Sequence, residues 1–277
     1  MQTQLRPNKL PVLNTAMPNQ SNNITKKTYG SGQPVVLLHG FAGSHKHWNN
    51  VIRHMPHNKF HIVTPDSIGF GMSDKPSELR YDIDDHSEAL VKDILENTDR
   101  QITLVGHSMG AMIALRIAKQ HPELVQKLVL INPPIFTSPE HAKRVVMGNL
   151  PLFHRVYIGK FGLPIYLFRN NSIVKHLLSS SLSKENDLGD IVDDYFNHTR
   201  RSFILSLRNT IFGYSMYDDL QHIPMTTKYI YSSTDPFYDP ASLNIFKKYP
   251  NMQTIEISGG HRVPFVNAQQ VANEICT

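Results

Sequence analysis

Residues 106–110 have the sequence GHSMG, a G-x-S-x-G pattern that could hold a serine hydroxyl at the tip of a sharp turn between a strand and a helix. At such a turn the serine takes a strained backbone conformation, and a side chain two residues to either side would collide with its neighbours. Glycine at both positions removes that collision. Residues 101–105 before the motif are rich in β-branched and apolar side chains, and 111–118 after it are helix formers. We therefore predict Ser108 to be a nucleophile.

A serine hydroxyl is a poor nucleophile at neutral pH and needs a base within hydrogen-bond reach, with a third group that holds the base in the right tautomer. Two later loops supply both groups. Asp235 follows a predicted strand at 225–231, and His261 follows two glycines after the last predicted strand. The chain order Ser108, Asp235, His261, with each residue after a strand, predicts a nucleophile, an orienting acid and a base at one edge of a parallel sheet.

The acid has one rival in its own loop. Asp239 lies further along, where it could instead be the N-cap of a helix that begins near Ala241. Asn132, after the strand predicted at 124–131, stands at another position from which an acid could reach the base, but an uncharged amide cannot take that role. We therefore predict Asp235 as the acid.

The oxyanion that forms on an acyl substrate needs two fixed hydrogen-bond donors. One predicted donor is the backbone N–H of Met109, because it begins the helix after Ser108, where the helix dipole adds partial positive charge. The second predicted donor is the backbone N–H of Phe41, in the glycine-containing turn HGFAG at 39–43. These two amides would form the oxyanion hole.

Other polar residues near these loops are predicted to be structural. His39 and Asp66 are expected to hydrogen-bond within their own turns. His45 and His47 lack a partner carboxylate at metal-ligand spacing, so we expect them to be exposed histidines of a helix or loop. The sequence thus predicts no metal and no organic cofactor.

Alternating strand-like and helix-like segments must position these loops. From residue 24 onward this alternation predicts an α/β fold with a doubly wound, mostly parallel sheet. The predicted parts of the chain are a flexible N-terminal arm at 1–22, a core at 23–134 and 219–277, and an inserted helical lid at 135–218.

The core elements follow from runs of β-branched residues and from helical periodicity. The predicted strands are 34–39, 60–64, 101–105, 124–131, 225–231 and 254–257. The predicted helices are 46–55, one from 82 or 84 to 97, 111–118, 242–249 and 264–275.

The predicted lid is rich in large aromatic side chains. These are Phe136, Phe153, Tyr157, Phe161, Tyr166, Phe168, Tyr195, Phe196, Phe203 and Phe212. Most are expected to form the lid's own core, but a segment that covers the active site turns some of them toward the cleft. An aromatic cleft wall would favour an apolar acyl or aryl group.

Composition narrows the choice of partner and compartment. The 277 residues are 40% apolar and 18% charged, as in ordinary globular proteins. The net charge is +5, but Lys and Arg occur in short scattered pairs, which argues against a nucleic-acid partner. The single cysteine, Cys276, cannot form an internal disulfide, and no uncharged run reaches the length of a membrane span. With no apolar signal region near residue 1, we expect a cytoplasmic protein without a membrane span.

Together these motifs resemble the α/β-hydrolase fold family, from residue 24 to the end of the chain. The resemblance is carried by HGFAG at 39–43, DSIGFGMSDKP at 66–76, GHSMG at 106–110, Asp235, and the pair Gly260 and His261. It implies Ser108 as nucleophile, His261 as general base and then acid, and Asp235 as orienting acid. It also implies the amides of Phe41 and Met109 as the oxyanion hole.

Relatives in this family act on esters, C–C bonds, epoxides, haloalkanes and amides. Epoxide hydrolases and haloalkane dehalogenases have an aspartate where this chain has Ser108, and proline iminopeptidases typically have tryptophan at the position of Met109. Meta-cleavage C–C hydrolases keep the serine. Metal-free perhydrolases share the triad and a methionine after the serine, so these last two activities stay open.

We expect a serine hydrolase that cleaves carboxylic esters of small, largely apolar substrates through an acyl-enzyme. Its partner would be a small-molecule ester or a related acyl substrate. Two alternatives stay open: hydrolysis of a C–C bond in a vinylogous diketone, and a ligand-binding or signalling protein that retains the hydrolase site. The oligomeric state does not follow from the sequence.

Overall fold

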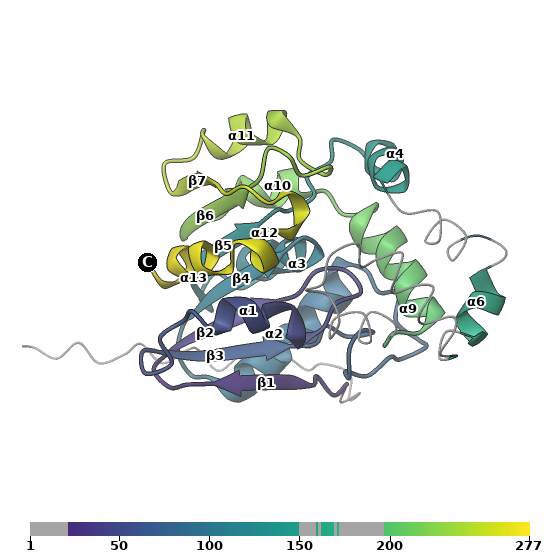
Figure 1. Cartoon of the computed structure of the whole chain (residues 1–277), viewed down its shortest axis with the longest axis horizontal. Coiled ribbons are helices and arrows are strands. Elements are labelled where there is room, and N and C mark those ends of the chain that lie inside the picture. Colours follow the sequence, from purple (N-terminus) through teal and green to yellow (C-terminus); the bar gives the residue numbers. More distant parts are fainter. Residues whose placement is uncertain (1–21, 150–158, 160–161, 169–170, 172–196) are drawn as a thin grey trace, which may run out of the picture.

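A seven-stranded sheet forms the centre of the molecule, in the order β1-β3-β2-β4-β5-β6-β7 (Figure 1). The structure is a computed structural model that describes residues 22–149, 159, 162–168, 171 and 197–277. All neighbouring strands run parallel except β1, which pairs antiparallel with β3. The predicted doubly wound, mostly parallel sheet is confirmed. The predicted N-terminal arm, apart from Asn22, lies outside the described residues.

The strands are short and the central ones are buried on both faces. They are β1 Lys26–Tyr29, β2 Gln33–Leu38, β3 Phe60–Pro65, β4 Ile102–His107, β5 Val125–Ile131, β6 Thr226–Tyr231 and β7 Met252–Glu256. In β2, Val35 and Leu37 belong to the apolar cluster on one face, and Val36 and Leu38 belong to the cluster on the other. This alternation, with apolar residues at every position from Pro34 to Leu38, is what a parallel strand covered on both faces requires.

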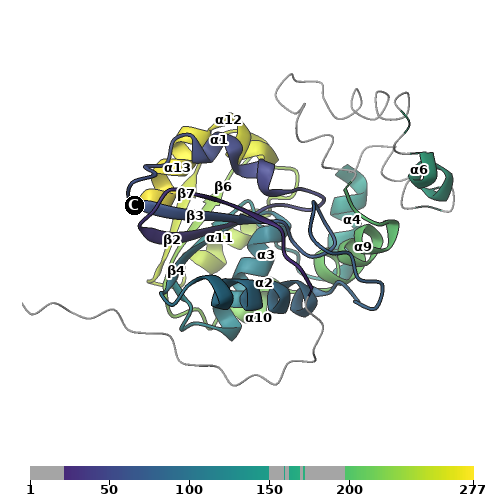
Figure 2. The same cartoon turned by 90° about the horizontal axis from the view of Figure 1, so that it is seen from below.

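Helices cover both faces of the sheet (Figure 2). One face carries α2 Ile83–Asn97, α3 Met109–Gln120 and α10 Met216–Leu220, and the other carries the 3₁₀-helix η1 His45–Trp48, α1 Asn49–Ile52, α12 Val263–Val266 and α13 Ala268–Cys276. The helix α11 Pro240–Phe246 packs beside β7, and Phe246 stacks on Tyr229 of β6 at 3.9 Å between ring centres.

The segment at 135–218, which we name the insert, contributes helices beyond one end of the sheet (Figures 1 and 2). These are α4 Pro139–Asn149, α6 Gly162–Phe168, α9 Arg200–Leu205 and the π-helix η2 Ser206–Ile211. The boundary predicted at residue 218 falls inside α10, which packs on α3 of the core. Of the ten aromatic residues in the prediction, five lie outside the described residues: Phe153, Tyr157, Phe161, Tyr195 and Phe196.

Hydrogen bonds tie α9 and η2 to the core. The hydroxyl of Ser202 donates to the carbonyl oxygen of Gly69 at 2.8 Å, and that of Thr210 donates to the carbonyl oxygen of Tyr81 at 2.8 Å. In η2 the amide of Phe212 donates to the carbonyl oxygen of Leu207 at 3.0 Å, five residues earlier, which is the bond that defines a π-helix. This part of the insert is therefore firmly docked on the core.

Three elements differ from the sequence prediction. The closing helix is broken into α12 and α13 at Asn267, whose φ of −126° and ψ of 42° are not helical and whose side chain donates to the carbonyl of Ser258. The helix predicted at 46–55 is a 3₁₀ turn followed by the short α1. Strand β1 was not predicted, because an edge strand with partly exposed lysines lacks the apolar run that marks the others.

Candidate active site

Ser108 forms the turn between β4 and α3, with φ 54° and ψ −121°. A positive φ is strained for a residue with a Cβ atom and persists only where the surroundings enforce it. A Cβ atom on Gly106 would lie 2.2 Å from the carbonyl oxygen of Gly110, and one on Gly110 would lie 2.4 Å from the carbonyl oxygen of Leu38. The two glycines therefore let β4, α3 and β2 pack closely enough to enforce the turn, as the sequence predicts.

The structure brings Ser108, His261 and Asp235 together. The Oγ atom of Ser108 lies 2.9 Å from Nε2 of His261, and Nδ1 of His261 lies 2.8 Å from Oδ2 of Asp235. Ser108 follows β4, Asp235 follows β6, and His261 lies in the 3₁₀ turn η3 Gly260–Arg262 after β7. These bonds link the three side chains in the order that removal of the serine proton requires.

Both carboxylate oxygens of the buried Asp235 accept hydrogen bonds. Oδ1 accepts from the amide of Phe237 at 2.8 Å, and Oδ2 also accepts from Nδ2 of Asn132 at 2.5 Å. Burial raises the pKa of Asp235, but the hydrogen bond and charge of His261, with the bonds from Phe237 and Asn132, bring that pKa below its ordinary value. The carboxylate is therefore charged at neutral pH and holds a proton on Nδ1 of His261.

Asn132 and His107 are polar residues of the site that the sequence prediction leaves without a role. The sequence shows only that Asn132 cannot be the acid. In the structure its side-chain amide donates to Asp235 and, at 3.3 Å, to the carbonyl oxygen of Gly260. Nε2 of His107 lies 2.9 Å from the carbonyl oxygen of His261. The only sequence signal for either residue is its place at the end of a strand, His107 within the GHSMG motif and Asn132 directly after the strand that follows in the chain.

The two predicted oxyanion donors flank Ser108. Met109 is the first residue of α3, and Phe41 follows Gly40, where a Cβ atom would lie 3.3 Å from Cβ of Ser108. Within the described part of the chain, neither the Phe41 amide nor the Met109 amide donates to a main-chain carbonyl oxygen. Both N–H groups are thus free of main-chain partners beside the serine.

An apolar cavity of about 270 Å³ opens beside Ser108 and His261. Its large apolar lining residues are Phe41, Pro134, Val146, Leu207, Ile211, Phe237 and Phe265. The three phenylalanines belong to core loops and α12, whereas Val146, Leu207 and Ile211 belong to α4 and η2 of the insert. Among the described residues, the insert therefore lines this cavity with aliphatic side chains, and the aromatic wall comes from the core.

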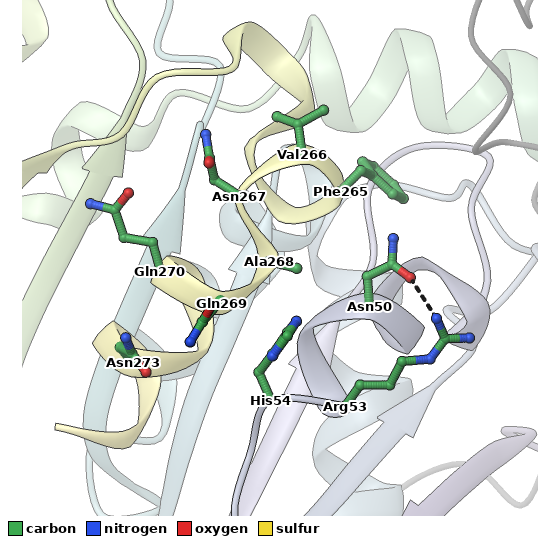
Figure 3. A pocket seen from close by; sticks show the side chains of 10 residues that line it. All are labelled: Asn50, Arg53, His54, Phe265, Val266, Asn267, Ala268, Gln269, Gln270 and Asn273. Carbon is green, nitrogen blue, oxygen red and sulfur yellow. Dashed lines mark hydrogen bonds between the residues drawn. The ribbon is translucent and has the colours of Figure 1, made fainter.

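A second concavity, of about 510 Å³, lies between α1 and the pair α12 and α13 (Figure 3). Its lining is mostly polar, with Asn50, Arg53 and His54 on one side and asparagine and glutamine residues of the segment 267–273 on the other. Nη1 of Arg53 donates to Oδ1 of Asn50 at 3.5 Å. Although this concavity is larger, the described residues that line it include no serine, threonine or cysteine. Among the described residues Phe265 alone lines both cavities, and Ser108 and His261 line the smaller one.

A second aspartate–histidine pair lies at the same edge of the sheet, after β3. Oδ1 of Asp66 accepts from the amide of His45 at 2.5 Å and lies 2.9 Å from its Nδ1, and Oδ2 accepts from the amide of Met72 at 2.8 Å. Burial raises the pKa of Asp66, but the hydrogen bond from His45, the charge of His39 and the two amides bring it below its ordinary value. The predicted structural role of Asp66 is confirmed.

Three nearby histidines are also buried. Nε2 of His39 accepts from the amide of Ser67 at 2.9 Å, so its predicted role as a structural hydrogen-bonder is confirmed. The prediction that His45 and His47 are exposed is wrong, because His45 is bound to Asp66 and His47 packs against Phe265 at 4.5 Å between ring centres. Burial, and the charges of neighbouring histidines, lower the pKa of His47 well below its ordinary value.

Among the described residues, no group of three or more His, Cys, Asp or Glu side chains is arranged to hold a metal ion. In the same residues, no helix combines the length and the apolar character that a membrane crossing needs.

Comparison with known proteins gives a family-level match. Residues 33–268 match the model of the family described as the alpha/beta hydrolase fold. Among solved structures, a Bacillus megaterium epoxide hydrolase superposes with a TM-score of 0.70 and 25% identity, covering 92% of this chain and 96% of that one. MenH from S. aureus superposes with a TM-score of 0.72 at 18% identity, covering 91% and 96%, which is a likeness of fold alone.

The curated relatives are longer proteins. "Probable lysophospholipase BODYGUARD 4" of Arabidopsis thaliana is 26% identical over 74% of this chain and 52% of its own length. "Cis-3-alkyl-4-alkyloxetan-2-one decarboxylase" of Shewanella oneidensis is 33% identical over 47% of this chain and 42% of its own length. The chain thus spans about half the length, or less, of these relatives.

Proposed function

This chain belongs to the alpha/beta hydrolase fold family, and we propose that within it the protein is a serine hydrolase that cleaves carboxylic esters of small, largely apolar substrates. The observation that carries the proposal is the 2.9 Å bond between Oγ of Ser108 and Nε2 of His261 at the wall of an apolar cavity. A serine bonded to an imidazole that is itself held by a carboxylate is the arrangement of an activated nucleophile.

In the proposed reaction Oγ of Ser108 attacks the acyl carbonyl carbon while Nε2 of His261 takes the hydroxyl proton. The amides of Phe41 and Met109 donate to the oxyanion, and His261 returns the proton to the departing alcohol oxygen. His261 then activates a water molecule that hydrolyses the acyl-enzyme. Asp235, ionised because its pKa is lowered, keeps the imidazole in the tautomer that each step needs.

The cavity supports an apolar acyl group of modest size. Ligand cavities commonly hold ~300–1,000 Å³, and this one, at about 270 Å³, lies just below that range. Carbon atoms of Phe41, Leu207 and Ile211 line it, and they gain free energy by removing an alkyl chain from water. We expect short and medium acyl chains to be preferred.

The name of one relative favours a carboxyl ester over other scissile bonds. A lysophospholipid is a carboxylic ester, and this match covers 52% of the named protein. The C–C hydrolase and ligand-binding alternatives have no specific observation in their favour. Hydrolysis of a vinylogous diketone would support the first, and single-turnover acylation with capture of a partner protein would support the second.

The test compares the variants Ser108→Ala and Ser67→Ala with the unaltered protein on p-nitrophenyl esters of increasing acyl length. Ser67 is also a buried serine, in the loop after β3, but its hydroxyl has no hydrogen-bond partner in the described structure. We expect Ser108→Ala to lose activity by roughly 10⁴-fold or more, with an unchanged circular dichroism spectrum. Ser67→Ala should retain activity, and equal hydrolysis by both variants would refute the proposal.

A further inference from the structure

The loop that carries His261 contains two adjacent glycines, Gly259 and Gly260. Gly259 and Gly260 have φ values of 130° and 59°, which are conformations that glycine adopts with little strain. The loop is held by the amide of Gly260, which donates to Oγ of Ser232 at 3.1 Å, and by Asn132, which donates to the carbonyl oxygen of Gly260. Neither of these bonds reaches the main chain of His261 itself.

The side chain of His107 bonds directly to the main chain of His261. In the described part of the chain His107 is the one residue whose side chain bonds the backbone of His261, with 2.9 Å between Nε2 and the carbonyl oxygen. Because a carbonyl oxygen only accepts, Nε2 of His107 carries the proton. Burial, with the charge of His261, lowers the pKa of His107 to about 3, so the ring is a neutral, constant donor over the pH range in which hydrolases work.

The ring of His107 fits between three parts of the site. It lies 4.7 Å from the ring of His47 and 4.9 Å from the ring of His261, measured between centres. A Cβ atom on Gly40 would lie 3.1 Å from its Nδ1. The ring is only 3% exposed, so the turn of the proposed oxyanion hole and the loop of the proposed base both pack around it.

The position of His107 in the chain means that this bond links the base to the nucleophile. His107 directly precedes Ser108, so the bond ties the loop of His261 to the end of the strand that carries the serine. A shift of that loop changes the distance between Nε2 of His261 and Oγ of Ser108, and misplacement of a reacting group by about 1 Å can cost roughly 10²-fold in rate. We propose that His107 is a positioning residue, which acts through His261 by fixing the base against the serine.

This proposal rests on the proposed function. It differs from a purely space-filling role of His107 in what it predicts for substitutions. If His107 only fills space, an apolar side chain of similar size should replace it. If its N–H bond positions His261, a side chain that keeps a donor near Nε2 should preserve the rate. Glutamine keeps such a donor, leucine has none, and asparagine places its donor one methylene short.

The experiment measures kcat and KM of His107→Gln, His107→Leu and His107→Asn on one p-nitrophenyl ester, with the rate at which a fluorophosphonate labels Ser108. For the leucine variant we expect kcat and the labelling rate to fall roughly 30- to 100-fold with KM within about twofold. The glutamine variant should stay within about fivefold of the unaltered protein, and asparagine should resemble leucine. A folded leucine variant with normal kcat, or a glutamine variant as slow as leucine, would overturn the proposal.

Two controls keep the outcomes apart. His57→Leu removes an imidazole bond of the same type, 3.0 Å from Nε2 to the carbonyl oxygen of Ile52, away from the cavity, and should leave kcat unchanged. If His107→Leu does not fold, the comparison of glutamine with asparagine decides the question. If Ser108→Ala is as active as the unaltered protein, the proposed function fails, whatever the His107 variants do.

Discussion

Two aspartate–histidine pairs lie at the same edge of the sheet, and their inner geometry is nearly the same. Asp66 and His45 are 2.9 Å apart and Asp235 and His261 are 2.8 Å apart, measured from carboxylate oxygen to Nδ1. Each carboxylate also accepts a bond from a backbone amide, and the pKa of each is lowered. The pair by itself therefore does not identify a catalytic acid and base.

What differs is the other end of each imidazole and what it touches. His261 reaches Oγ of Ser108 and faces an apolar cavity, whereas His45 belongs to η1 and joins the loop after β2 to the loop after β3. The Asp66 pair thus holds two loops together, and the Asp235 pair is left with a proton acceptor aimed at a hydroxyl. The same type of hydrogen-bonded pair therefore joins two loops in one place and is a candidate for proton transfer in the other.

The largest predicted effect comes from Asp235→Asn. An amide in this position donates to Nδ1 of His261, which puts the proton on Nε2 and removes the acceptor that faces Ser108. In a known serine protease the equivalent change lowers kcat by ~10⁴-fold, and we expect a loss of roughly that order here. The measurement is kcat on a p-nitrophenyl ester beside an unfolding curve, and retention of more than about a tenth of the activity would contradict the assignment.

Asp66→Asn should lower the stability of the fold and leave kcat nearly unchanged. The amide cannot accept from His45 and Met72 with both of its atoms, and a buried donor left unsatisfied costs ~1–3 kcal/mol. We expect unfolding in urea at a lower concentration, with kcat of the folded fraction within about threefold of normal. A specific loss of kcat at full stability would show that the two pairs are not separable in this way.

Acidification tests whether histidines or the two carboxylates control stability. Asp66 and Asp235 have lowered pKa values, so their ionised carboxylates stabilise the fold at every pH above the ordinary carboxyl pKa of 3.8. This stabilisation is lost only when the pH falls below 3.8. His86 and His107 have pKa values of about 3 against 6.5, so the unfolded chain binds their protons first and stability falls as pH drops below 6.5. We expect about 1.4 kcal/mol per pH unit for each such histidine.

Urea unfolding between about pH 4 and pH 7 measures this slope. The variant His86→Leu removes one buried histidine that lies outside the active site, where it bonds Oγ of Ser206, and should reduce the slope by one proton. A stability that stays flat until the carboxylates titrate would show that the pKa values of the buried histidines are not lowered by folding.

Asn132→Ala sharpens the comparison within the Asp235 pair. The variant removes a donor to Oδ2 of Asp235 and to the carbonyl of Gly260, so the pKa of Asp235 rises toward its ordinary value and the loop of His261 loosens. We expect kcat to fall roughly tenfold, since a hydrogen bond to a charged group is worth ~1.5–3 kcal/mol at most. A pH–rate profile in which the acid limb and the plateau are both unchanged would show that Asn132 has no role in the reaction.

The smallest expected effect distinguishes Asp235 from its sequence neighbour. Asp239 is the N-cap of α11, where its carboxylate accepts from the amide of Ala241 at 2.9 Å. Replacing an N-cap by alanine costs ~1 kcal/mol, so Asp239→Ala should lower the melting temperature by a few degrees and leave kcat unchanged. A large fall in kcat would mean that the acid had been assigned to the wrong residue.

The sequence predicts the sheet and the meeting of Ser108, Asp235 and His261, because both follow from strand order. Parallel strands carry their following loops to one edge, so residues distant in the chain meet there without knowledge of loop conformation. Asp239 as a helix N-cap and Asp66 as a loop acceptor are confirmed for a similar reason, since each depends on a local pattern.

Features that depend on loop conformation escape the sequence. The roles of Asn132 and His107 as donors arise from the path of the His261 loop, which no periodicity encodes. The burial of His45 and His47 depends on a long-range partner in one case and on packing against α12 in the other. The aliphatic lining supplied by Leu207 and Ile211 depends on helix phase within the insert, which composition does not reveal.

The π-helix η2 makes the cavity sensitive to chain length as well as to side-chain identity. Such a turn contains one residue more than an α-helical turn, and two of its residues, Leu207 and Ile211, line the cavity. Deletion of one residue from this stretch would restore the ordinary helix and rotate the preceding side chains by about 100° relative to those that follow. A single lost codon could thus exchange this wall of the cavity while the serine, histidine and aspartate keep their places, which offers evolution or a designed library a route to a differently shaped cavity without point substitution.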